Sequence, residues 1–223
     1  MSRFAVVTWE LARAEWLAEW RSRQVTTTMG LLTALVVVTF GFAGRAQGAH
    51  LAVAAFWVSL LLAAVAGTAQ VLGRLEDTSV DEAWLTSGVG RSALFAGRSL
   101  ALAGLLAPVA GLAALLVALL FGPRPLGNPM GFAALAILGT LALALASTTV
   151  SLTLTRASVG SGKLMPLVLL AVAMPVAYLG AWGCRALAAG PGAVLAPPFL
   201  LLGLLVLVWS GVGLLVAHRA RAR

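Results

Sequence analysis

Charged side chains are scarce in this chain, and long stretches lack them altogether. Asp, Glu, Lys and Arg make up 10% of the 223 residues, and none of them occurs in the segments 24–44, 46–73, 99–123, 125–155, 164–184 and 186–218. A helix needs about 20 predominantly apolar residues to cross a bilayer, and each segment is long enough. This pattern excludes an ordinary soluble domain and predicts six transmembrane helices.

Several catalytic and binding signatures are also missing. The single cysteine, Cys184, excludes an intramolecular disulfide, and the two histidines, His50 and His218, have no second ligand at metal-binding spacing. No Walker A sequence or Gly-rich phosphate loop occurs, so energy from ATP would have to come from another chain. We therefore expect no metal site and no catalytic residues, and an intramembrane enzyme is the least favoured class.

The cationic residues are distributed unevenly along the connections. Three connections carry one each, Arg45, Arg124 and Arg185, and the other cations lie in the N-terminal segment, the second and fourth connections and the C-terminus. Short loops rich in Lys and Arg stay in the cytoplasm, so both termini are predicted inside. The net charge of +8 is spread over loop ends without a basic cluster that contains aromatics, which favours contact with lipid over nucleic acid.

The chain divides into three parts. Residues 1–24 are expected to contain an amphipathic helix, over 4–22, on the membrane surface. Trp9, Trp16 and Trp20 share one stripe of this helix, and indoles favour the headgroup level. The helix is either a plain tryptophan anchor or an elbow that orients the first span and packs on a partner. Residues 25–217 form the six-helix domain, and 218–223 form a basic cytoplasmic tail.

We place the six spans at 25–44, 50–73, 98–121, 131–154, 164–184 and 197–217. Pro108 falls inside the third span, and Pro166 and Pro175 fall inside the fifth. A proline removes one helical hydrogen bond, so each is a predicted kink, and Pro175 is either a functional bend or a static one. The hydroxyl-rich run 147–155 has no base nearby, which indicates bonds to helix carbonyls and helix packing.

The connection 74–97 is the most informative polar segment. It gathers acidic side chains around one tryptophan, which suits a short helix that docks on a basic groove of a partner protein. A solvated loop without a partner is the alternative. The residues that we assign to this coupling loop are Arg74, Glu76, Asp77, Asp81, Glu82 and Trp84.

Several short stretches carry a family resemblance. They are FWVSLLLA at 56–63, RLED at 74–77, RSALFAGR at 91–98, LGTL at 138–141 and MPV at 174–176. In order and spacing they resemble the haem exporter protein B family, CcmB, the membrane permease of the cytochrome c maturation ABC transporter. The resemblance covers roughly residues 50–180, and it departs from the family's usual pattern at Thr78, Gly88 and Arg98.

The resemblance implies a non-catalytic, type-2 ABC permease in the bacterial inner membrane. It implies a separate ATPase subunit (CcmA-like) that binds the ATP, a haem-handling membrane protein (CcmC-like) and a haem chaperone (CcmE-like). Haem is then a transported or handled ligand, and a homodimer is a further possible assembly. Apart from the resemblance, His50 lies at a predicted helix end, where it is either a haem contact on the outer surface or an ordinary helix-end histidine. A generic ABC-2 permease for a lipid or drug, and a scaffold that transports nothing, remain alternatives.

Overall fold

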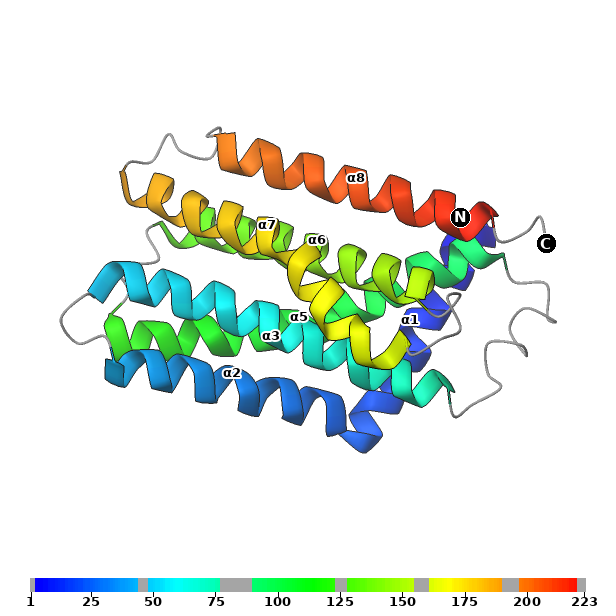
Figure 1. Ribbon diagram of the computed structural model, residues 1–223, viewed down its shortest axis with the longest axis horizontal. Helices are drawn as coiled ribbons and strands as arrows, with labels where there is room; N and C mark the ends of the chain where they lie inside the picture. The colour runs from blue at the N-terminus through cyan, green and yellow to red at the C-terminus, as the bar shows by residue number, and fades with distance from the viewer. Residues whose placement is uncertain are drawn as a thin grey trace.

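Seven helices form the part of the chain that the computed structural model describes, namely residues 3–43, 48–76, 90–122, 128–154, 161–189 and 197–219 (Figure 1). They are α1 (Arg3–Ser22), α2 (Gln24–Ala43), α3 (Gly48–Glu76), α5 (Arg91–Phe121), α6 (Pro129–Leu154), α7 (Ser161–Ala189) and α8 (Pro197–Arg219). Six of them, α2 to α8, are long and apolar enough to cross a membrane. The predicted class, an all-α multi-pass membrane protein, is confirmed.

The six long helices run alternately in opposite directions along one bundle (Figure 1). The helix α1 crosses the end of the bundle where α2 begins, and α8 finishes at that same end. We call this the α1 end. An even number of spans therefore returns the chain to the side on which it started. That this side is the cytoplasm stays a prediction from the arginine distribution.

Two helices extend furthest beyond the spans that the sequence predicts. α5 begins at Arg91 rather than at residue 98, and α7 ends at Ala189 rather than at residue 184. The predicted spans follow the uncharged runs, whereas a helix continues as long as its side chains find packing partners. Phe95 in the first turns of α5 is buried, and its ring fills the space beside Gly213 of α8. As a result, Arg98 lies inside a helix and not at its edge.

The centre of the core is the indole of Trp57 on α3, which is only 1% exposed. A Cβ atom on Gly139 of α6 or on Gly180 of α7 would overlap this ring, so both positions must lack a side chain for three helices to meet here. The indole Nε1 donates a hydrogen bond of 3.5 Å to the Sγ atom of Cys184. Small residues commonly allow such close approach between membrane helices.

The hydroxyl groups of α6 mostly bond to their own helix, as the sequence predicts. Thr148 Oγ1 donates to the Ala144 carbonyl at 2.9 Å, and Thr149 Oγ1 donates to the Leu145 carbonyl at 2.7 Å. Thr153 Oγ1 lies 3.1 Å from the carbonyl of Thr149. These bonds satisfy the hydroxyls inside an apolar bundle, so the structural interpretation is confirmed for these three threonines.

The three prolines lie inside helices, Pro108 in α5 and the other two, Pro166 and Pro175, in α7. The ribbon of α7 changes direction near its middle, where Pro175 lies (Figure 1). A functional role for this bend stays a prediction.

Candidate functional site

The junction between α1 and α2 is a fixed elbow. Arg23, between the two helices, has a φ of 52°, which is the left-handed region, and its N–H donates to the Glu19 carbonyl at 2.6 Å. The Glu19 carboxylate accepts the N–H of Thr26 at 2.8 Å and the hydroxyl of Ser22 at 3.3 Å. A carboxylate at a helix N-terminus satisfies a free N–H and complements the helix dipole. Glu19 is only 4% exposed, and its bonds to Ser22 of α1 and Thr26 of α2 hold the two helices at a fixed angle.

The helix α1 is fastened to the first half of α5. The indole Nε1 of Trp16 donates a 2.9 Å hydrogen bond to the Ala101 carbonyl, which is 85 residues away in the sequence. The ring lies directly over Gly104, where a Cβ atom would overlap it. About two helical turns earlier on α5, a Cβ atom on Gly97 would lie 3.2 Å from the Thr8 carbonyl oxygen. Two glycines on one face of α5 therefore let α1 approach its backbone.

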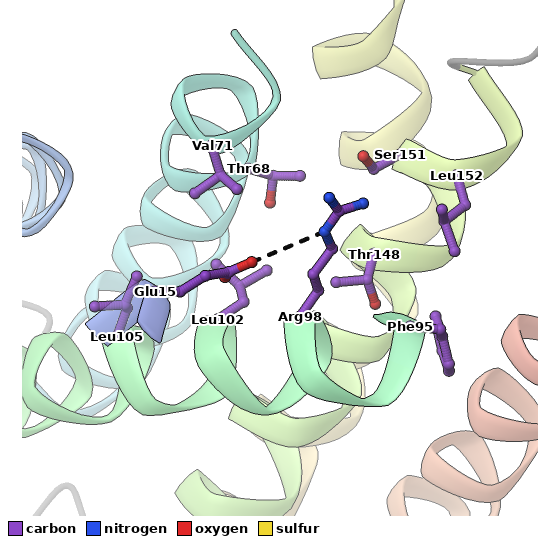
Figure 2. Close-up of a pocket in the computed structure, with 10 residues that line it drawn as sticks. All are labelled: Glu15, Thr68, Val71, Phe95, Arg98, Leu102, Leu105, Thr148, Ser151 and Leu152. Carbon is purple, nitrogen blue, oxygen red and sulfur yellow. Dashed lines mark ion pairs between the residues drawn. The ribbon is translucent and has the colours of Figure 1, made fainter. Parts of the chain in front are cut away.

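An ion pair strengthens this contact. Arg98 Nε of α5 lies 3.8 Å from Glu15 Oε1 of α1, and the two side chains are 16% and 31% exposed. Figure 2 shows the Arg98 side chain extending from α5 into the space between Glu15 and the polar side chains Thr148 and Ser151 of α6. At this exposure the pair contributes about 0.5–1 kcal/mol, and the partly dry surroundings favour the upper part of that range.

The cavity around Arg98 is too small for a substrate. Its volume is about 30 Å³, which is room for about two water molecules, and α1, α3, α5 and α6 all contribute side chains to it. On its α6 side, Ser99 Oγ and Thr148 Oγ1 lie 2.7 Å apart and share a hydrogen bond. This cluster is therefore a joint between four helices. We call it the Arg98 joint.

The Arg98 joint lies beside the predicted coupling loop. Arg74 and Glu76 belong to the last turn of α3, and α5 begins at Arg91, so the two helices that flank the loop both contribute to the joint. The other predicted coupling residues, Asp77, Asp81, Glu82 and Trp84, lie outside the described residues, as do the side-chain positions of Arg74 and Glu76. Their role in coupling stays a prediction.

The three tryptophans of α1 differ in their surroundings. Trp16 faces α5, whereas Trp9 and Trp20 are exposed at the bundle surface, and the rings of Trp9 and Trp16 meet edge to face with centroids 5.6 Å apart. The stripe expected from the sequence thus contains one tryptophan that joins helices and two that face outward. Anchoring of the outward pair at the headgroup level stays a prediction.

Sequence reasoning missed the partners within the Arg98 joint. Glu15 and Arg98 are far apart in the chain, and nothing in the spacing of either residue points to the other. The one signal was Arg98 itself, a cation next to a long apolar run. A cation one or two turns inside a membrane helix is usually paired with an acidic side chain, because an unpaired charge is costly there.

The opposite end of the bundle carries a second, larger cavity of about 450 Å³. His50 of α3, Phe121 of α5 and Arg185 of α7 line it, together with the buried Cys184. The imidazole and the guanidinium, which the sequence places on separate connections, therefore border one space. Within the described ranges, no three His, Cys, Asp or Glu side chains gather in a group that could hold a metal ion.

Comparison with known proteins adds no family to this description. No family model, no curated protein and no solved structure matches the chain. The fold and the joint define the class: an all-α, multi-pass membrane protein with a helix crossing one end of its bundle.

Proposed function

We propose that this chain is the membrane subunit, a type-2 permease, of an ABC transporter whose ATPase is a separate chain. The Arg98 joint is the observation that carries this proposal. At the joint, α5 binds α1 and α6 through Trp16, Glu15 and Thr148, next to α3. The connection between α3 and α5 contains the clustered acids on which the ATPase would dock. A movement of that connection would therefore be transmitted through the joint to all four helices.

The membrane interior also suits a subunit that takes its energy from a partner. The described parts of the six long helices contain no Asp, Glu, Lys, Arg or His over 24–43, 51–73, 99–121, 129–154, 164–184 and 197–217. Proton-coupled pumps and ion-coupled carriers usually place ionisable groups at this depth. A transport protein without such ionisable groups takes its energy from another source, and in this proposal an ATPase docked at one end of the bundle supplies that energy.

The cytochrome c branch of the proposal rests on the sequence resemblance alone. It specifies a bacterial inner membrane, a CcmA-like ATPase, and CcmC-like and CcmE-like partners, with haem as the cargo or handled ligand. The cavity beside His50 and Arg185 is a suitable place for an anionic, metal-bearing cargo to meet this chain, because it offers an imidazole and a cation beside apolar walls. A generic ABC-2 permease for a lipid or drug, and a membrane scaffold, are the competing functions.

Charge reversal in the connection tests the proposal. Glu76→Lys together with Asp77→Lys would place like charges against a basic groove, which costs several kcal/mol at an interface. A loss of about 3 kcal/mol weakens association roughly a hundredfold. The variant should reach the membrane at normal levels because added cations agree with a cytoplasmic loop. It should lose the ATPase on co-purification and, in the cytochrome c branch, leave little mature cytochrome c.

Glu10→Lys is a suitable control for this experiment, because Glu10 is an exposed acid of α1 at the same end of the bundle. It changes the charge at that end without touching the connection, and it should leave co-purification intact. Normal ATPase association in the double variant would refute the coupling-loop assignment. Normal association together with ATP hydrolysis that does not depend on this chain would favour the scaffold.

A further inference from the structure

A groove lies at the α1–α2 elbow, outside the Arg98 joint. It measures about 640 Å³ and lies between the end of α1, the first turn of α2 and the middle of α5. Trp20, Arg23 and Thr27 on its rim are exposed at the surface of the bundle, as is Pro108 on its α5 side. The groove is therefore open to the lipid that surrounds the helices.

The groove is polar at the elbow and apolar along α5. Arg23, Thr26 and Thr27 supply a cation and two hydroxyl-bearing side chains, and Leu105 and Pro108 supply an apolar wall. Figure 1 shows that α1 crosses the end of the bundle and that α5 runs along it. The polar lining residues therefore lie toward the α1 end, and the apolar ones lie further along the bundle. A phospholipid in the adjacent leaflet has the same order, with its headgroup outermost and its acyl chains inward.

The charges in the groove favour an anionic headgroup. Arg23 is the one cation among the lining residues, and its guanidinium lies 5.7 Å from the centroid of the Trp20 ring, which holds it at the rim. Glu19 is the one lining acid, but its carboxylate is almost fully buried and accepts bonds from Thr26 and Ser22. The charge that the groove presents outward is therefore positive.

We propose that this groove binds one anionic phospholipid of the leaflet on the α1 side, with the phosphate at Arg23 and an acyl chain along Leu105 and Pro108. The bound lipid fills the space between α1 and α5 that the Trp16 contact leaves open. The bound lipid then adds to the protein contacts that already hold the elbow. A second copy of the chain is a poorer occupant, because its apolar helices would bury the Arg23 charge without a partner.

Native mass spectrometry of the full-length protein tests this site, because one spectrum reports both the bound lipids and the oligomeric state. The probes are phosphatidylglycerol and phosphatidylcholine with identical acyl chains, titrated into the detergent-purified protein. The wild type should retain one phosphatidylglycerol at least fivefold more tightly than phosphatidylcholine. Arg23→Asn should weaken phosphatidylglycerol binding about tenfold, which corresponds to about 1.4 kcal/mol, and should abolish the preference.

Asparagine is chosen because it tolerates the left-handed backbone of position 23 better than most residues, so the elbow is kept. Arg21→Asn is the matched control, since Arg21 is an exposed cation in the last turn of α1 that does not line the groove. It should leave the lipid preference unchanged. Thr27→Phe fills the groove from α2 with charge unaltered, and it should weaken both lipids.

Three results would overturn the proposal. Equal losses in Arg23→Asn and Arg21→Asn would mean that only general surface charge attracts the lipid. Unchanged lipid retention in Thr27→Phe would mean that the lipid lies elsewhere. Dissociation of a wild-type dimer by Thr27→Phe, with lipid counts unchanged, would make a second copy of the chain the occupant of the groove.

Discussion

Replacing Gly104 with leucine should weaken the attachment of α1 to α5. The Trp16 indole occupies the space that any side chain at position 104 would need, so the ring must leave and its hydrogen bond to Ala101 must break. That bond contributes about 1 kcal/mol. The neighbouring ion pair of Glu15 and Arg98 contributes about 0.5–1 kcal/mol more, and the leucine also breaks it because α1 can then no longer approach α5 closely.

The apolar contact of the indole adds little to this sum. A displaced tryptophan at the end of a membrane bundle moves into lipid or the headgroup zone, which solvates it well. The total cost is therefore about 2 kcal/mol, which raises the population of the detached state roughly thirtyfold. Trp16→Phe removes the hydrogen bond but keeps most of the packing, so its expected effect is about 1 kcal/mol, or roughly fivefold.

Hydrogen exchange of α1 in lipid nanodiscs measures this directly, because the amides of α1 exchange through the detached state. Exchange should accelerate roughly thirtyfold in Gly104→Leu and fivefold in Trp16→Phe. Gly111→Leu is the matched control on the same helix, since a Cβ atom there meets nothing within 4 Å. Equal exchange of α1 in the Gly104 and Gly111 variants would refute the assignment of α5 as the anchor of α1.

Three further predictions concern the rest of the bundle. Gly180→Leu overpacks the buried indole on α3 at a cost of about 1–3 kcal/mol, so Tm should fall by about 5 °C, and Gly203→Leu, where a Cβ atom has open space, should leave Tm unchanged. Pro175→Ala should insert normally but reduce transport or cytochrome c yield if the bend of α7 matters, and wild-type yield would remove that role. Reporter fusions after Leu126 and Ser161 should report the periplasm and the cytoplasm, respectively, and a cytoplasmic signal at Leu126 would contradict the six-span topology.

The helices could be predicted from the sequence because hydrocarbon imposes a simple rule. Each span needs an uncharged run of sufficient length, and the six runs of this chain are separated by single charges or by charged connections. The ends of α5 and α7 were less predictable, since Phe95 and Leu187 extend these helices through packing rather than through hydropathy.

The Arg98 joint was not predictable in the same way. Its contacts join residues that are distant in the chain, and a single sequence contains no information on which face of α1 meets which face of α5. The tryptophan stripe correctly selected α1 as a distinct element, but it did not separate Trp16, which bonds to Ala101, from the exposed Trp20. The chain has 24 glycines, so the sequence does not distinguish Gly104, which contacts Trp16, from glycines without such a contact.

The most direct test of the central claim is purification of the full-length protein from its native membrane in mild detergent, with identification of the chains that accompany it and measurement of their ATP hydrolysis. We expect an ATPase with a Walker A motif in constant ratio to this chain, and hydrolysis that changes when Glu76 and Asp77 are reversed to lysine. In the cytochrome c branch, a haem-binding membrane protein should accompany them. Recovery of a folded protein without any ATPase would contradict the account.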